Sequence, residues 1–114
     1  MPLIFKIIAR ESWVEAQKRG QLDGAAIDLA DGFIHLSAAD QVRETAAKYF
    51  AGQENLVLVA YEASGFGAEL KWEISRGGAL FPHVYGKLDP AQALWVKPLP
   101  WNGFLHDFPE GLSR

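Results

Sequence analysis

The chain has 114 residues, of which 49% are hydrophobic and 22% charged, which is typical of one globular domain and excludes a disordered segment. Its net charge of −3 lacks the basic surface that long nucleic acids require. The chain has no cysteine, which excludes disulfides and thiolate chemistry and favours a cytoplasmic protein. Residues 1–9 are apolar but too short to span a membrane, and they lack the pattern of a signal peptide, so we expect no membrane partner.

The first third of the chain predicts a strand, a helix and a loop. Residues 3–9 (LIFKIIA) form an apolar run that is typical of a buried strand, with Lys6 as its one charge. Ser12 starts a capping box, so we expect a helix to begin at the next residue and to end at Gly20. Residues 21–32 are expected to form a loop.

A strand, a second helix and a central strand are expected next. Residues 33–36 predict a short strand, and Ser37 is expected to cap a helix that ends near Gly52. Within that helix the apolar positions share one face. Residues 55–61 (NLVLVAY) are an unbroken, partly β-branched apolar run, which indicates a central strand.

The second half of the chain is dominated by strands. Short strands are expected at 70–74, 84–85 and 93–97. Residues 98–114 are expected to be a tail that wraps or frays, with His106 exposed to solvent. Because the helices come early and the strands late, we expect one α+β domain whose core covers about residues 3–97.

The stretch DGFIHLS (residues 31–37) contains the first candidate site residues. Alternation along a strand places His35 and Ser37 on one face and the apolar Ile34 and Leu36 on the other. Ser37 is explained either as a helix cap or as part of a phosphate site at a helix N-terminus. His35 is either a structural histidine or a site residue.

Three further features carry candidate chemistry. His83 and Tyr85 share a face, where they either bind a hydroxyl, move a proton and stack on a ring, or serve only as packing. Glu73 is either a base that orients a ribose hydroxyl or a solvated carboxylate. Lys6 lies within an apolar strand, so its charge needs either a partner or a path to solvent.

Several stretches together resemble a small bacterial family, domain of unknown function 952. The likeness runs from about Leu3 to Val96 and rests on IFKI, DGFIHLS, LVLVAY, LKWE and FPHVYGKL. This family looks like a divergent ADP-ribosyltransferase fold, which implies a split sheet with an NAD-type cleft between its halves. RNA 2′-phosphotransferases share that fold and use histidines without a catalytic glutamate.

The resemblance also implies roles for individual residues. It assigns catalytic roles to His35, Glu73 and His83, and ligand-binding roles to Lys6, Ser37 and Tyr85. Members of the family commonly have Tyr-His-Ile in the opening strand, where this chain has Phe5-Lys6-Ile7. Lysine keeps a cation but loses the two-sided hydrogen bonding of imidazole, so Lys6 is expected to contact a phosphate.

Three hypotheses remain open at this point. The first is an enzyme or binding protein for NAD, as candidate cofactor, or for another nucleotide-like ligand. The second is a non-catalytic module that binds a nucleotide or a peptide. The third is a metal-dependent hydrolase that uses His35 and His83. The oligomeric state cannot be read from these patterns.

Overall fold

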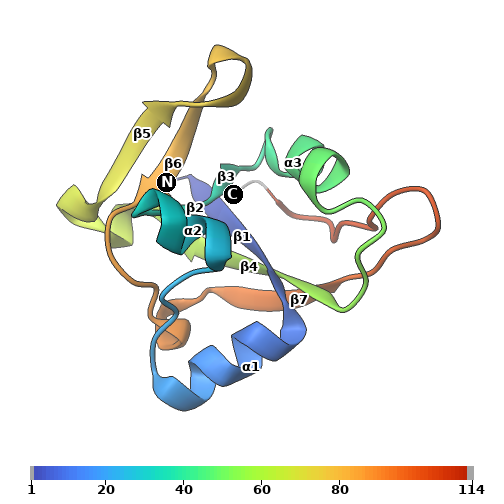
Figure 1. The fold of residues 1–114 in the computed structure, drawn as a ribbon, viewed down its shortest axis with the longest axis horizontal. Coiled ribbons are helices and arrows are strands. Elements are labelled where there is room, and N and C mark those ends of the chain that lie inside the picture. Colours follow the sequence, from blue (N-terminus) through green and yellow to red (C-terminus); the bar gives the residue numbers. More distant parts are fainter. Residues whose placement is uncertain (1, 113–114) are drawn as a thin grey trace.

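The computed structural model describes residues 2–112, which form two antiparallel sheets and three α-helices (Figure 1). The larger sheet has the order β3-β1-β4-β7 and the smaller one β2-β6-β5. The strands of the larger sheet are β3 (Ser37–Ala38), β1 (Leu3–Ala9), β4 (Leu56–Glu62) and β7 (Trp95–Leu99). Those of the smaller sheet are β2 (Ile34–His35), β6 (Leu80–Val84) and β5 (Leu70–Ile74). The expected α+β class is confirmed.

The larger sheet is covered on both faces. Helix α1 (Arg10–Arg19) packs with Trp13 on the face that contains Ile4 and Ile8 of β1. Helix α3 (Val42–Tyr49) packs with Val42 on the opposite face, which contains Phe5. This double burial explains why β1 and β4 are continuous apolar runs in the sequence. None of the helices within residues 2–112 is long and apolar enough to cross a membrane.

The chain passes from one sheet to the other within the HLS stretch. Ile34 and His35 pair with β6 of the smaller sheet, whereas Ser37 pairs with Phe5 of the larger one. Between them, the backbone N–H of Leu36 donates to the carbonyl of Pro82 at 3.0 Å. The two sheets therefore meet at the point where the sequence places its first candidate residues.

Three expectations about helix boundaries are wrong. Helix α1 begins at Arg10, directly after β1, and Ser12 lies inside its first turn; the Arg10 N–H donates to the carbonyl of Asn55 at 2.8 Å. The predicted end at Gly20, with φ 81°, is confirmed. Residues 21–32 contain a helix, α2 (Ala26–Asp31), where we expected a loop.

The third wrong boundary concerns the second predicted helix. Helix α3 begins at Val42, not after Ser37. Ser37 is a strand residue whose backbone pairs with Phe5, and its hydroxyl lies 3.0 Å from that of Thr45. Ser37 therefore caps no helix, and no helix N-terminus directly follows it to form the alternative phosphate site.

The late strands and the tail also differ in detail from the expectations. The strand at 70–74 is confirmed as β5, while β6 and β7 are shifted relative to the predicted ranges. The tail wraps over the larger sheet, where Leu112 is buried. His106 is 7% exposed, and its Nε2 lies 2.9 Å from the carbonyl of Gln53, so the expectation of an exposed histidine is wrong.

Candidate functional site

Two histidines face each other across strands β2 and β6. His35 and His83 are directly opposite in the strand register, and their ring centroids are 5.4 Å apart at an interplanar angle of 69°. Phe33 stacks on His83 with a centroid distance of 4.2 Å and also contacts the His35 ring at 4.7 Å. The pairing of β2 with β6 therefore brings the two separate histidine motifs of the sequence together.

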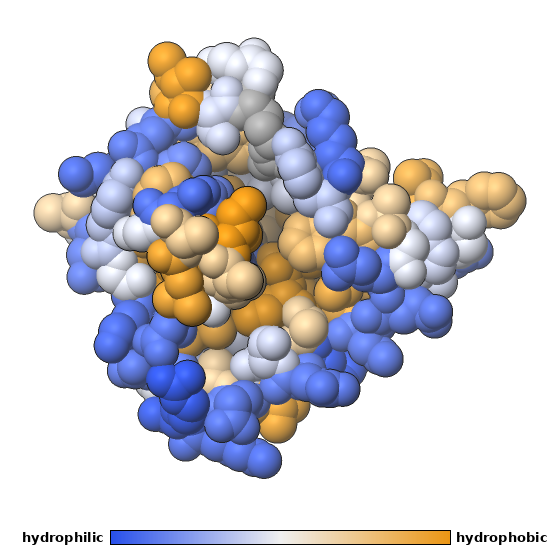
Figure 2. All heavy atoms as spheres, viewed as in Figure 1, coloured by the Kyte–Doolittle hydropathy of each residue, from blue (hydrophilic) through white to orange (hydrophobic). Residues whose placement is uncertain are grey.

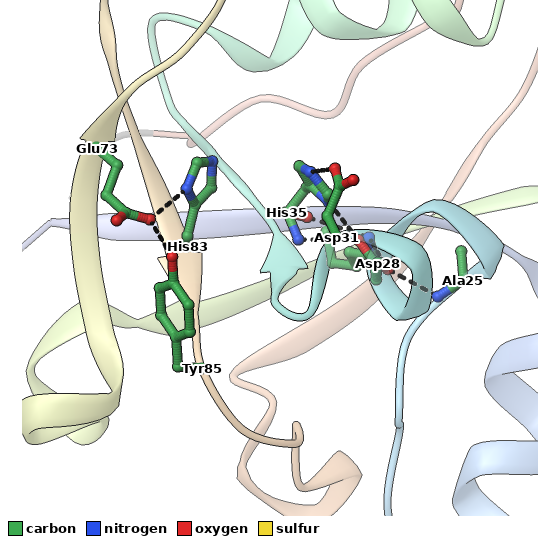
Figure 3. A network of polar contacts seen from close by, with 8 residues as sticks. Ala25, Asp28, Asp31, His35, Glu73, His83 and Tyr85 are labelled. Carbon is green, nitrogen blue, oxygen red and sulfur yellow. Dashed lines mark hydrogen bonds and ion pairs between the residues drawn. The ribbon is translucent and has the colours of Figure 1, made fainter.

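His35 lies between two carboxylates of helix α2 (Figure 3). Its Nδ1 is 2.6 Å from Asp28 Oδ1, and its Nε2 is 2.9 Å from Asp31 Oδ2. A neutral imidazole has one N–H, whereas an imidazolium donates from both nitrogens. Both ring nitrogens of His35 therefore have a carboxylate acceptor within hydrogen-bond distance.

Asp28 connects His35 to Lys6 in the interior. Its Oδ2 accepts from Lys6 Nζ at 2.8 Å and from the Ala25 N–H at 2.7 Å, and its Oδ1 accepts from the His35 N–H at 2.9 Å. Lys6 Nζ also donates to the His35 carbonyl at 3.1 Å. Burial opposes ionisation of Asp28, but the Lys6 charge and the hydrogen bonds from Lys6 and His35 hold its pKa below the ordinary value. Burial is also the main reason why the pKa of Lys6 is lowered.

A second carboxylate orients His83. Glu73 Oε1 lies 2.8 Å from His83 Nδ1 and accepts from the Tyr85 hydroxyl at the same distance. Hydrogen bonds from His83 and Tyr85 lower the pKa of Glu73, and the bond to Glu73 raises the pKa of Tyr85. Because an ionised carboxylate only accepts, Nδ1 of His83 carries the proton, and neutral His83 keeps a lone pair on Nε2.

Both histidines line one cleft of about 300 Å³ between the two sheets. Figure 2 shows hydrophobic side chains gathered around a hollow in the middle of this face, between α2 and α3. The polar side chains of the cleft include Lys6, Asp31, His35, Ser37, Thr45 and His83. Its apolar walls include Ile27, Tyr49, Phe50 and Phe81. The site is thus a mainly apolar cleft with a few convergent polar groups.

The structure places the six residues selected from the sequence in two neighbouring groups, one in the cleft and one beside His83. Lys6, His35, Ser37 and His83 line the cleft. Glu73 and Tyr85 are in the second group: Glu73 contacts the His83 ring, and Tyr85 donates to Glu73. Lys6 has the partner that its buried charge was expected to need, because it donates to Asp28 and to a backbone carbonyl and is 5% exposed.

Three residues of the site were missed at the level of sequence: Asp28, Asp31 and Phe33. The buried charge of Lys6 was the one signal for Asp28, since such a lysine requires an acidic partner. For Asp31 and Phe33 the signal was their position in the DGFIHLS stretch, next to His35.

The donor groups do not favour a metal-dependent hydrolase. Among residues 2–112, no three histidine, cysteine or acidic side chains are grouped so that they could hold a metal ion. The Nε2 atom of His35, which would have to face a metal, lies 2.9 Å from Asp31 Oδ2.

The fold and the site together define a small α+β protein in which two antiparallel sheets meet at a histidine-lined cleft. The chain belongs to the family described as "Protein of unknown function (DUF952)", whose sequence profile matches residues 7–96. This confirms the family that the motifs resemble.

Solved structures of one relative have the same fold. The crystal structure of protein CC0527 from Caulobacter crescentus is 50% identical in sequence, with a TM-score of 0.89, over 92% of this chain and 93% of that chain. The solution NMR structure of CC0527 is 51% identical, with a TM-score of 0.82, over 91% of this chain and 90% of that chain. No match is found among curated proteins.

Proposed function

We propose that the cleft binds a nucleotide-like ligand of the NAD or ribose-phosphate class, and that His35 and His83 transfer protons to and from it. The observation that supports this proposal is the pair of carboxylate-oriented histidines on one cleft. The two rings differ in their contacts, because His35 has a carboxylate at both nitrogens and His83 at Nδ1, and two histidines on one cleft can serve as an acid and a base. The choice of this ligand class follows from the resemblance of the sequence motifs to the ADP-ribosyltransferase fold, which 2′-phosphotransferases share.

The proposed division of roles follows from the two carboxylate contacts. The lone pair on His83 Nε2 accepts the proton of a ribose hydroxyl as its oxygen attacks a phosphate. The imidazolium of His35 gives a proton to the leaving oxygen, so that the charge is balanced within the cleft. Because Glu73 lies behind His83, it is a positioning residue and not itself the base.

The size of the cleft limits the ligand. A volume of about 300 Å³ is at the lower end for small-molecule sites, so the cleft suits one nucleoside moiety better than an entire dinucleotide. Tyr49, Phe50 and Phe81 supply an apolar wall for a planar ring. The hydroxyls of Ser37 and Thr45 line the same cleft and match the hydroxyls of a ribose.

Ligand-observed NMR with NAD, ADP-ribose, a 2′-phosphorylated nucleotide and ATP tests this proposal. We expect one of the first three to bind, and His35→Asn to weaken its binding at least tenfold while an Asn donor towards Asp28 helps to preserve the fold. Leu29→Ala is the matched control, because Leu29 lies on the same helix α2 but is exposed and does not line this cleft, so binding is expected to be retained. If none of the ligands binds, the proposal is wrong.

Turnover separates an enzyme from a non-catalytic module. His83→Asn keeps a donor towards Glu73 but lacks the Nε2 lone pair, so we expect it to bind the ligand without converting it. Mass spectrometry of the ligand after incubation with the wild type detects conversion. Binding without any mass change in the wild type would support the non-catalytic nucleotide-binding module instead.

A further inference from the structure

Strand β5 has an open edge. It is the last strand of the order β2-β6-β5, and Figure 1 shows it at the periphery of the molecule. Within residues 2–112, no strand pairs with its outer side. Strand edges of this kind are templates for pairing with another chain.

The hydrogen-bond pattern determines which residues face outwards. The Tyr85 N–H donates to the Glu69 carbonyl at 2.8 Å, and the Ser75 N–H donates to the Ala79 carbonyl at 2.9 Å. These bonds lie at both ends of β5, so its odd-numbered residues bond to β6. Because bonding alternates along an antiparallel strand, Leu70, Trp72 and Ile74 direct their backbone N–H and C=O groups to the open edge.

The side chains at this edge are poorly protected from solvent. Trp72 is 40% exposed and Ile74 is 74% exposed, and Leu80, which is paired with Ile74 on β6, is 51% exposed. The strand has no proline to block pairing. Its two charges, Lys71 and Glu73, have opposite signs and can therefore complement each other across a symmetric interface.

We propose that β5 pairs antiparallel with β5 of a second copy of this chain, about a two-fold axis at Trp72. In this register Trp72 exchanges backbone hydrogen bonds with Trp72 of the partner subunit, and Leu70 does so with Ile74 of the partner subunit. The two three-stranded sheets become one continuous sheet. This inference does not depend on the ligand proposed for the cleft.

Charge complementarity selects this register among those that the hydrogen bonds allow. Only even-numbered residues face the open edge, so they must pair with even-numbered residues of the other copy. One strand can therefore slide past the other only in steps of two residues. One such shift places Lys71 opposite Lys71 of the partner subunit, and the other places Glu73 opposite Glu73 of the partner subunit. With Trp72 at the axis, Lys71 lies opposite Glu73 of the partner subunit, and this contact occurs twice.

The pairing would also affect the cleft. Glu73 holds His83 and Tyr85, and the dimer adds Lys71 of the partner subunit beside the same carboxylate. The second copy therefore contributes a charge next to a residue that positions the candidate base.

Single cysteines test the register directly, because the chain has none of its own. Directly opposite, hydrogen-bonded residues have Cα atoms about 5.5 Å apart, which is within disulfide range. We expect Trp72→Cys to form a covalent dimer on mild oxidation. Ile74→Cys is the control, because its two copies would lie about 13 Å apart along the strands. Ile74 is more exposed than Trp72, so random collisions between monomers would crosslink Ile74→Cys more readily, which is the opposite of the expected result.

Sedimentation equilibrium from low micromolar to near-millimolar protein tests the wild-type association. We expect a reversible dimer that Lys71→Glu weakens at least tenfold, whereas Lys18→Glu, a charge reversal on α1, leaves it unchanged. Circular dichroism verifies that each variant is folded. A wild type that stays monomeric throughout, or an Ile74→Cys variant that crosslinks as readily as Trp72→Cys, would overturn the proposal.

Discussion

At the scale of single residues, Asp28 holds the polar network together. It is 1% exposed, and its two oxygens accept hydrogen bonds from Lys6, Ala25 and His35. Two charged groups in such an interior are tolerated only because each compensates the other. Removal of one is therefore expected to cost more than the loss of a single contact.

We predict that Asp28→Asn lowers the free energy of unfolding at neutral pH by about 3–5 kcal/mol, because it leaves the Lys6 ammonium buried without an anion. Urea unfolding measures this change. Asp31→Asn is the control, since Asp31 is largely exposed and its pair with His35 should contribute no more than about 1 kcal/mol. Equal effects of the two substitutions would show that the buried pair is not important for stability.

The pH dependence of the same variant follows from the pKa of Asp28. Its pKa in the folded state is below the ordinary value of 3.8, so its contribution is complete above that value. As the pH falls below 3.8, the carboxylate is protonated and the contribution is lost. The difference in stability between wild type and Asp28→Asn should therefore narrow as the pH falls below 3.8, which urea unfolding over a series of acidic buffers measures.

At the scale of elements, helix α2 depends on its contacts with the rest of the fold. Six residues are too few for a stable isolated helix, so tertiary contacts must hold it. The turn before it brings Gly24 close to Asp28: a Cβ atom at Gly24 would lie 2.6 Å from the Cβ of Asp28, and the φ of Gly24 is +119°. Only glycine satisfies both conditions.

We predict that Gly24→Ala destabilises the protein by about 1–3 kcal/mol, because the new methyl group displaces Asp28 and strains the backbone. Thermal unfolding measures the effect, and NMR shifts of His35 report whether its contact with Asp28 changes. Gly65→Ala is the matched control, since Gly65 has no positive φ and no neighbouring atom within 4 Å of an added Cβ. A shift of His35 as large in Gly65→Ala would contradict this explanation.

Helix α2 also shows where prediction from sequence fails. It exposes Ile27 and Leu29 and buries Asp28, which is the reverse of the usual amphipathic pattern. Hydrophobic periodicity therefore cannot detect it. The strands β1 and β4 were predictable because their burial follows the apolar runs of the sequence. Strand β5 was predictable because turns set its boundaries. Ser37 was misassigned because a capping residue and a strand residue look alike without knowledge of the partner strand.

The sequence predicted only in part that the site residues lie close together, because their proximity depends on which strands pair. Alternation identified His35 and His83 as polar positions on apolar strands, but their distance depends on the pairing of β2 with β6. No local pattern specifies which strands pair over so long a separation. The residue types were therefore visible in the sequence, whereas their carboxylate partners on α2 were not.

At the scale of the whole molecule, the C-terminal tail completes the core. Leu112 is 6% exposed and joins the cluster that contains Leu3 and Phe5 of β1 and Val42 of α3. The tail thus covers the face of the larger sheet that α1 leaves free. This segment is rich in proline and glycine, so its composition alone indicated a peripheral role.

We predict that Leu112→Ala lowers the free energy of unfolding by about 2–5 kcal/mol, because it removes buried methyl groups from a packed cluster. Leu105→Ala is the matched control: the same change in the same tail, at a residue that is 59% exposed, should cost no more than about 0.5 kcal/mol. Urea unfolding of both variants measures the contrast. If the two substitutions cost the same, the tail does not seal the sheet, and α3 alone must protect β1 on that face.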